Sequence, residues 1–184
     1  MSRVGRAPIS LPEKVSVKVD GDVVTVSGPL GTLSQRINDR KITVEIENGV
    51  LKVIRANDEK KTKAMHGLYR VLIGNMVAGV VTPFSKTLVV NGVGYKVQST
   101  GKKLTMNLGM SHPVEINAPD GIEITSQDMP DKTIHVTVKG ISKELVGHVA
   151  ANIKAKRPVE PYHLYGIRYS TEIMTKKEGK TAGK

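Results

Sequence analysis

The pattern of apolar residues changes period twice along this 184-residue chain, in the same direction each time. Short segments in which apolar and polar residues alternate, the period of a half-buried strand, come first. One longer segment then follows in which apolar residues recur every three or four positions, the period of a helix. The changes fall near residues 58 and 141. A chain that repeats this order is predicted to contain two α+β modules, each with an antiparallel sheet packed against one helix.

The first half of the chain is predicted to hold two hairpins followed by a helix. Asn48-Gly49 lies between two alternating segments and is a strong signal for a tight turn, and Asp20-Gly21-Asp22 marks an earlier turn. The helix is expected from Asp58, because acidic residues favour a helix start. The predicted strands are 15–19, 24–26, 33–37, 42–46 and 50–54, and the predicted apolar helix face is Met65, Leu68, Leu72, Met76 and Val80.

The second half repeats this order. Gly92 and Gly94 lie in a bend between two extended segments. These glycines either serve only to bend the chain or let the backbone approach a phosphate closely. The predicted strands are 86–90, 95–97, 104–108, 114–116, 122–124 and 134–138, and the predicted helix face is Ile141, Leu145, Val149 and Ile153. The fold class is therefore α+β, with repeats at residues 1–82 and 83–156 and a basic C-terminal arm at residues 157–184.

The arm concentrates aromatic and basic side chains. Three of the chain's six aromatic residues fall between Arg157 and Tyr169, in a segment whose two prolines disfavour a helix. Tyrosine and arginine side chains interleaved on an irregular segment are typical of an RNA-binding surface. An arm that folds back onto its own domain is the equally weighted alternative. Basic residues continue toward the C-terminus: Lys176, Lys177, Lys180 and Lys184.

The net charge of +11 favours a polyanionic partner, and its distribution is uneven. Residues 1–82 carry a net charge of +5, residues 83–153 a net +1, and residues 154–184 again +5. The excess in the second half therefore lies in its last part, joined directly to the aromatic cluster. Each Lys or Arg that neutralises a phosphate adds affinity without reading sequence.

The residue types that carry enzymatic chemistry form no recognisable pattern here. The chain has no Cys, and no two of its five histidines have the spacing of a helical zinc site. The glycines near residues 28 and 92 lack the remaining residues of nucleotide-binding loops. We therefore expect no catalytic residue, no metal, no cofactor and no small-molecule substrate. Two other classes stay open: an enzyme whose site assembles only in space, and an adaptor that binds a protein through an exposed sheet edge.

The sequence predicts no membrane or secretory segment. No apolar run approaches the ~20 residues that span a bilayer, and the N-terminus lacks the apolar centre of a signal peptide. We therefore expect a soluble, cytoplasmic protein.

Short motifs occur along the whole chain, in an order that is more specific than any one of them. They are residues 1–5, 75–80, 92–96, 108–116, 138–144, 150–153, 157–158, 160–162 and 166–169. Together they resemble the bacterial large-subunit ribosomal protein L6 family.

This resemblance implies two duplicated α+β domains and direct binding to the large-subunit ribosomal RNA, mainly through the second domain and the C-terminal arm. It also implies a place near the base of the stalk, where translation factors dock, beside neighbouring ribosomal proteins. The residues expected to bind RNA are Lys96, Lys154, Lys156, Arg157, Tyr162, His163, Tyr165, Gly166, Arg168, Tyr169, Lys176, Lys177 and Lys180.

One segment departs from the pattern of this family. Where the pattern has Lys-Gly-Lys ahead of Gly-Ile-Arg-Tyr, this chain has His163, Leu164 and Tyr165. Two phosphate contacts are therefore in question. His163 and Tyr165 are able to hydrogen-bond and stack, whereas Leu164 offers no polar replacement.

Overall fold

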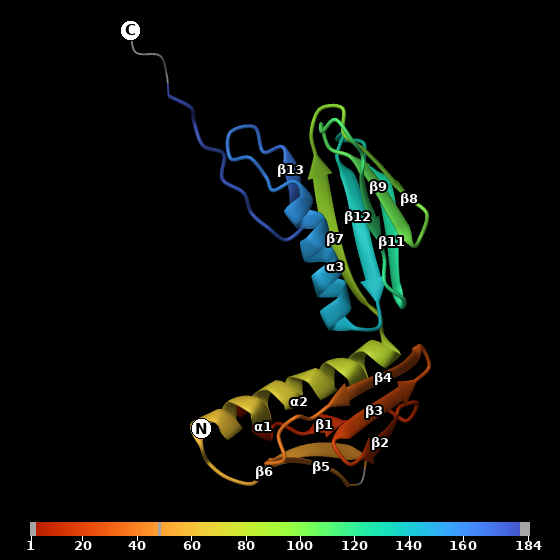
Figure 1. Ribbon diagram of the computed structural model, residues 1–184, viewed down its shortest axis with the longest axis vertical. Coiled ribbons are helices and arrows are strands. Elements are labelled where there is room, and N and C mark those ends of the chain that lie inside the picture. The colour runs from red at the N-terminus through yellow and green to blue at the C-terminus, as the bar shows by residue number, and fades with distance from the viewer. Residues whose placement is uncertain (1–2, 48, 181–184) are drawn as a thin grey trace. The chain divides into compact units, whose positions relative to one another are not determined.

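The computed structural model describes residues 3–47 and 49–180 and contains two compact units, each with its own hydrophobic core (Figure 1). The first unit comprises Met1–Pro83 and Ile141–Lys143, and the second comprises Phe84–Gly140 and Glu144–Lys184. The α+β class expected from the sequence is confirmed. The C-terminal residues group with the second unit, and a separate arm beginning at residue 157 stays a prediction.

The first unit contains two three-stranded antiparallel sheets and one long helix. The strand order is β2-β3-β4 in one sheet and β1-β6-β5 in the other. Side chains from both sheets and from the helix form one core, in which Val24, Val26 and Leu51 are fully buried. The elements are α1 (Arg3–Arg6), β1 (Ile9–Ser10), β2 (Ser16–Asp20), β3 (Val23–Gly28), β4 (Gly31–Arg36), β5 (Ile42–Glu47), β6 (Val50–Arg55) and α2 (Lys60–Val81).

The two predicted hairpins of the first unit are confirmed. β2 pairs with β3 around Gly21, and β5 pairs with β6 beside Gly49. Both glycines have positive φ angles, 58° and 75°, which residues with a Cβ adopt only with strain. Asn48, the other half of the predicted Asn-Gly turn, lies outside the described residues.

The observed inner face of α2 is rotated from the predicted one. Leu68, predicted to face the core, is 48% exposed, whereas Tyr69 and Ile73 are buried. His66 is also buried, and its Nε2 lies 2.8 Å from the carbonyl oxygen of Val53. Because α2 is apolar around most of its surface, spacing alone does not select one face. The hydrogen bond of His66 helps to select it.

By length and composition alone α2 is apolar enough to cross a membrane, contrary to the expectation that no segment is. Such a helix is equally typical of a protein core. α2 contacts β3, β4 and β6, and eight of its residues are buried. It is therefore the core helix of the first unit.

The second unit also contains two antiparallel sheets, with strand orders β11-β12-β7-β13 and β10-β9-β8. Figure 1 shows the helix α3 running along the four-stranded sheet. Leu88, Val136 and Ile167 lie in the core between them and are fully buried. The elements are β7 (Phe84–Asn91), β8 (Lys96–Ser99), β9 (Lys103–Asn107), β10 (Val114–Asn117), β11 (Ile122–Asp128), β12 (Ile134–Gly140), α3 (Lys143–Lys156) and β13 (Gly166–Tyr169).

The inner face of α3 is predicted correctly at two of four positions. Val149 and Ile153 are buried as expected. Leu145 is 39% exposed, and its neighbour Val146 is buried in its place. Ile141 precedes the helix.

The sequence pattern fails to predict three short elements: β13, the two-residue β1 and the four-residue helix α1. β13 is the one that shapes the second unit. Its four residues lie within the expected arm, yet they pair with β7 in an antiparallel register. A four-residue strand has too little alternation to be recognised, and its position depends on a partner far away in the sequence. The arm therefore does fold back onto its own unit over this stretch, as one of the two alternatives expects.

Two glycines of the second unit allow a matched test of its packing. A Cβ on Gly140 would lie 2.5 Å from Ile122 Cδ1 and 2.8 Å from the carbonyl oxygen of Gly121, whereas a Cβ on Gly147, in α3, meets nothing nearer than Lys86 Nζ at 3.9 Å. We expect Gly140→Ala to lower the free energy of unfolding by about 1–3 kcal/mol through overpacking. Gly147→Ala is expected to raise it by up to about 1 kcal/mol through helix propensity.

Urea denaturation of the two variants measures both effects. Equal stability of Gly140→Ala and the unchanged chain would contradict the close packing of β11, β12 and α3 around this residue.

Candidate nucleic-acid interface

Several connections of the second unit meet at one end of its four-stranded sheet. β12 begins at the residue paired with Val90, and β13 begins at the residue paired with Asn91, so both begin where β7 ends. Lys96 starts β8 just after the bend that follows β7. The segment after α3 joins this end, because the amide of Ile167 donates to the carbonyl of Arg157 at 2.8 Å. Figure 1 shows these connections together at the upper end of the unit.

Tyr95 shapes the bend after β7. Its amide donates to the carbonyl of Gly92 at 3.3 Å, and a Cβ on Gly92 would collide with the Tyr95 ring. The Tyr95 hydroxyl accepts a hydrogen bond from Arg157 Nε at 3.3 Å. Gly92 therefore makes room for a ring of its own chain. This geometry accounts for Gly92 as a bend residue and needs no phosphate.

The segment between α3 and β13 is a closed loop. The amide of Glu160 donates to the carbonyl of Tyr165 at 2.9 Å, and the amide of Leu164 donates to the carbonyl of Glu160 at 3.0 Å. Asn91 Nδ2 at the end of β7 donates to the Leu164 carbonyl at 3.3 Å. Leu164 has a φ of 60°, a left-handed conformation that non-glycine residues rarely adopt. These hydrogen bonds hold it there.

Two aromatic rings stack on the outside of this loop. The ring centroids of His163 and Tyr165 are 5.6 Å apart, with an interplanar angle of 15°. His163 Nδ1 lies 3.3 Å from Glu160 Oε1, a contact that is an ion pair only when the imidazole is protonated. Both rings are exposed, as is Tyr162. The loop therefore presents flat ring faces to solvent, the surface on which unpaired bases stack.

Gly166 has a structural role. It is buried, its φ is 138°, and a Cβ there would lie 2.6 Å from the carbonyl oxygen of Pro158. Pro158 forms an isolated bridge with Ile167. Gly166 therefore lets the start of β13 pass the segment after α3, and it contributes no exposed surface for a phosphate.

Lys154, Arg168 and Tyr169 form a cluster with Glu172. Lys154 Nζ lies 2.8 and 2.7 Å from the two carboxylate oxygens of Glu172, and Arg168 Nη1 donates to the Glu172 carbonyl at 3.3 Å. Lys154 Nζ and Lys86 Nζ lie 4.9 and 5.2 Å from the centroid of the Tyr169 ring. The hydrogen bond from Lys154 lowers the pKa of the Glu172 carboxyl below its usual range. These predicted RNA-binding residues already contact their own chain.

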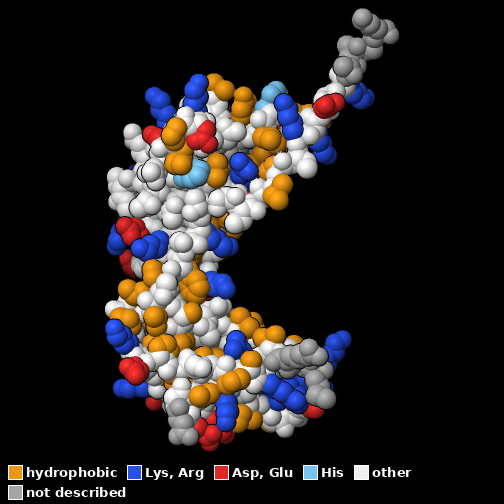
Figure 2. Space-filling model, turned by 180° about the vertical axis from the view of Figure 1, so that it is seen from behind, with side chains coloured by type: hydrophobic (Ala, Val, Ile, Leu, Met, Phe, Trp, Pro, Cys, Tyr) orange, Lys and Arg blue, Asp and Glu red, His pale blue; other side chains and the backbone are white. Residues whose placement is uncertain are grey.

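Other basic side chains at this end and along the C-terminal segment are unpaired. Figure 2 shows Lys and Arg side chains on the upper end of the second unit and along that segment. The segment is held near the loop, because the amide of Lys177 donates to the carbonyl of Pro161 at 2.9 Å. Among residues 3–47 and 49–180, these lysine amines make no hydrogen bond or ion pair: Lys96, Lys132, Lys156, Lys176, Lys177 and Lys180.

Sequence reasoning misses Lys132 as a member of this region, and it misses Lys86 as a cation beside the Tyr169 ring. Lys132 lies in the turn between β11 and β12, which the strand register brings to the same end of the sheet as Lys96. Predicting this requires the order of the strands, which alternation does not give. The only local signal is the Pro130-Asp131 pair, which marks a turn.

Metal binding finds no support in the part of the chain that the structure describes. No three His, Asp or Glu side chains in it lie close enough to hold an ion. What the interface offers is ammonium and guanidinium groups for phosphates, and ring faces for bases.

Comparison with known proteins assigns the family. The family model described as ribosomal protein L6 matches residues 11–82 and 91–170, one segment in each unit. A relative from Caldicellulosiruptor bescii is 51% identical over 184 residues, which cover 100% of this chain and 98% of the relative. A relative from Chlorobium phaeobacteroides is 47% identical, with both chains covered completely. Both relatives carry the name large ribosomal subunit protein uL6.

The resemblance found in the short motifs is therefore confirmed over the full length. The chain belongs to the ribosomal protein L6 family, whose members are structural proteins and not enzymes.

Proposed function

We propose that this protein is a structural constituent of the large ribosomal subunit that binds large-subunit ribosomal RNA directly through the end of its second unit. As a member of its family it works in the cytoplasmic ribosome. The observation that carries the RNA-binding proposal is the combination of unpaired lysines and exposed stacked rings at one end of a rigid sheet. Lysine amines bind phosphates, and unpaired bases stack on exposed aromatic rings.

The roles within the proposed interface follow from the contacts. The unpaired amines of Lys96, Lys156, Lys176, Lys177 and Lys180 and the guanidinium of Arg157 would neutralise phosphates. Tyr162, His163 and Tyr165 would stack on bases or sugars. Lys154, Arg168 and Tyr169 would contribute chiefly by holding β13 and the following segment in place, as would Gly166.

The position in the subunit is the finer part of the proposal. From the family we infer a place near the stalk base and the region where translation factors dock, with neighbouring ribosomal proteins as partners. The competing adaptor function would use a free sheet edge. The four-stranded sheet of the second unit has β11 and β13 as its edge strands, so such edges exist, but the unpaired lysines and exposed rings favour RNA over this alternative.

A tail substitution tests the phosphate contacts. Deleting residues 154–184 would remove β13 and the buried Ile167, so loss of binding would not separate unfolding from lost contacts. We expect the double substitution Lys176→Gln, Lys177→Gln to reduce the slope of log affinity against log salt by about 1.4–1.8, because each phosphate contact contributes ~0.7–0.9. The measurement is binding to a large-subunit ribosomal RNA transcript across a series of KCl concentrations.

Lys102→Gln is the matched control. Lys102 is exposed in the same unit, but it lies in the turn after β8, at the end away from Lys96, and it pairs with Asp120 at 3.2 Å. The Lys102→Gln substitution should leave the slope of log affinity against log salt unchanged. A reduction about half as large by Lys102→Gln, which removes one charge where the double substitution removes two, would mean that the net charge of the unit, and not this end of it, drives binding.

A second prediction concerns the loop that departs from the family pattern. His163→Lys and Tyr165→Lys each restore a cation on an exposed side chain. Each is expected to steepen the salt dependence of binding by ~0.7–0.9, because a new phosphate contact releases one more counterion. The same binding series measures this. If the slope does not change, these side chains do not face phosphate.

A third prediction uses Glu172, whose pKa is lowered chiefly by its hydrogen bond from Lys154. A carboxyl with a depressed folded-state pKa stabilises the fold at pH values above its unfolded-state pKa, and the contribution is lost as the pH falls through the folded value. Glu172→Gln should therefore lower the free energy of unfolding by about 0.5–1 kcal/mol at pH 7, a modest value because the pair is about 30% exposed. The difference should be smaller at pH 3 than at pH 7.

Urea denaturation of both chains at pH 7 and pH 3 provides the measurement. A destabilisation that is equally large at the two pH values would mean that packing, not the ion pair, explains the effect.

A further inference from the structure

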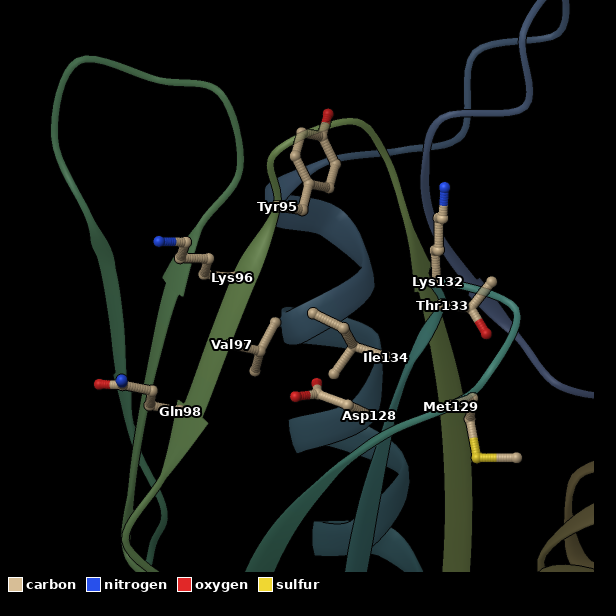
Figure 3. Close-up of a pocket in the computed structure, with 9 residues that line it drawn as sticks. All are labelled: Tyr95, Lys96, Val97, Gln98, Asp128, Met129, Lys132, Thr133 and Ile134. Atoms are coloured by element: carbon tan, nitrogen blue, oxygen red, sulfur yellow. The ribbon is translucent and has the colours of Figure 1, made fainter.

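A cavity of about 410 Å³ opens at the same end of the second unit (Figure 3). It lies between the start of β8 and the turn that joins β11 to β12. Its volume falls in the range of cavities that hold small organic groups. All the residues that line it belong to the second unit.

The inner part of the cavity is apolar. Val97 and Ile134 lie on opposite sides of it, and each is only 8% exposed. The ring of Tyr95 lies at the upper end of the cavity in Figure 3. This ring is supported by Gly92 beneath it and by Arg157 at its hydroxyl. A flat apolar group entering here would meet aliphatic side chains and an aromatic ring.

The wall of the cavity carries polar groups without partners. Thr133 Oγ1 is buried, and no hydrogen bond of the described residues satisfies it. The Asp128 carboxylate also lines the cavity and makes no hydrogen bond or ion pair within the described chain. The Thr133 hydroxyl is enclosed and has almost no accessible surface, whereas the Asp128 side chain is exposed. The carboxylate is therefore the hydrogen-bond acceptor that a group entering the cavity can reach.

The rim of the cavity is fixed and basic. The amide of Met129 donates to the carbonyl of Thr133 at 2.9 Å, and the amide of Lys132 donates to the carbonyl of Met129 at 3.2 Å. These bonds hold Lys132 at a φ of 61°, which is rare for a residue with a side chain. The amines of Lys132 and Lys96 are unpaired at the two sides of the cavity.

From this arrangement we infer that the cavity receives a single unpaired base of the bound RNA. The base lies between Tyr95, Val97 and Ile134, and its exocyclic amino group donates to the carboxylate of Asp128. Lys96 and Lys132 bind the phosphates on either side. This inference rests on the proposed RNA-binding function and adds to it the class of group that enters this cavity.

The carboxylate decides between a base and a phosphate. A phosphate in the cavity would lie beside the Asp128 carboxylate, and the two negative charges would repel each other. An amino-bearing base presents donors to the same carboxylate, as when Asp or Glu accepts from cytosine N4. Adenine, cytosine and guanine carry such a group and uracil does not.

Two aspartates of one turn give the experiment its contrast. Both side chains are exposed, but only Asp128 lines the cavity. If the surface acted only through its charge, Asp128→Asn and Asp131→Asn would both strengthen binding to the ribosomal RNA transcript slightly, since each removes a negative charge. We expect Asp131→Asn to behave in this way and Asp128→Asn to weaken binding about tenfold with an unchanged salt slope.

Thr133→Val provides a control in the same turn that is not expected to unfold the chain. It replaces the enclosed, unsatisfied hydroxyl by a methyl group of the same shape, so stability should be unchanged or higher. Binding to the transcript should be unchanged, because a group in the cavity cannot reach this hydroxyl. Lys132→Gln, in contrast, should reduce the slope by ~0.7–0.9.

A direct probe identifies the group. Adenosine, cytidine, guanosine and uridine monophosphates and inorganic phosphate are titrated separately into the full ¹⁵N-labelled chain. We expect saturable shifts of the amides of residues 95–98 and 128–134 with at least one amino-bearing nucleotide, and none with uridine monophosphate or phosphate. Equal shifts with phosphate, or no shifts with any nucleotide, would overturn the inference.

Different results would contradict the proposed function and the base-binding cavity. If the transcript does not bind the unchanged chain, RNA binding itself is wrong. If the transcript binds but Asp128→Asn behaves like Asp131→Asn, RNA binding stands and only the base-binding cavity is wrong.

Discussion

The pairing of β13 with β7 is the interaction on which the proposed interface depends. It buries Ile167 completely and brings the segment after α3 to the end of the sheet where β7, β8 and β12 have their connections. Without it, the stacked rings of His163 and Tyr165 would belong to a loose tail. Fixing these side chains before binding reduces the entropy that an RNA complex would otherwise lose. The strand thus turns a basic tail into one side of a surface.

The distribution of ion pairs separates the cations that hold this surface together from those that remain available. Lys154 is engaged by Glu172 and lies over the Tyr169 ring, so its charge is largely compensated within the chain. Lys96 and Lys132 have no such partner among the described residues. Composition treats all of these lysines alike. The structure divides them, because a carboxylate placed beside one cation removes it from the set that attracts phosphate.

The sequence predicts most of the elements because strands and helices leave a periodic signal. The hairpins around Gly21 and Gly49 follow from turn chemistry, and the two long helices α2 and α3 follow from spacing. The rotation of α2 is not predictable in this way, since it depends on the buried hydrogen bonds of His66. β13 is also not predictable, because its identity as a strand depends on a distant partner and not on its own four residues.

The candidate site shows the same division. Aromatic and basic composition identifies the segment from Arg157 onward, but no local pattern indicates that the turn containing Lys132 and Thr133 lies at the same end of the unit. That proximity is a property of the strand order β11-β12-β7-β13. The cavity between this turn and β8 likewise exists only once two sheets are packed together.

The departure at residues 163–165 changes the side chains of a loop whose backbone is held by hydrogen bonds. The family pattern has glycine at position 164, and Leu164 keeps the left-handed φ of 60° that glycine adopts freely. It does so because Glu160 and Asn91 hold both its amide and its carbonyl, and those contacts offset a strain of about 1–2 kcal/mol. Since the backbone path is held by these bonds, the substituted side chains project from the positions that two lysines would occupy. The chain has therefore exchanged charge for ring faces at this point, and any contact it makes there with RNA depends on stacking more than on counterion release.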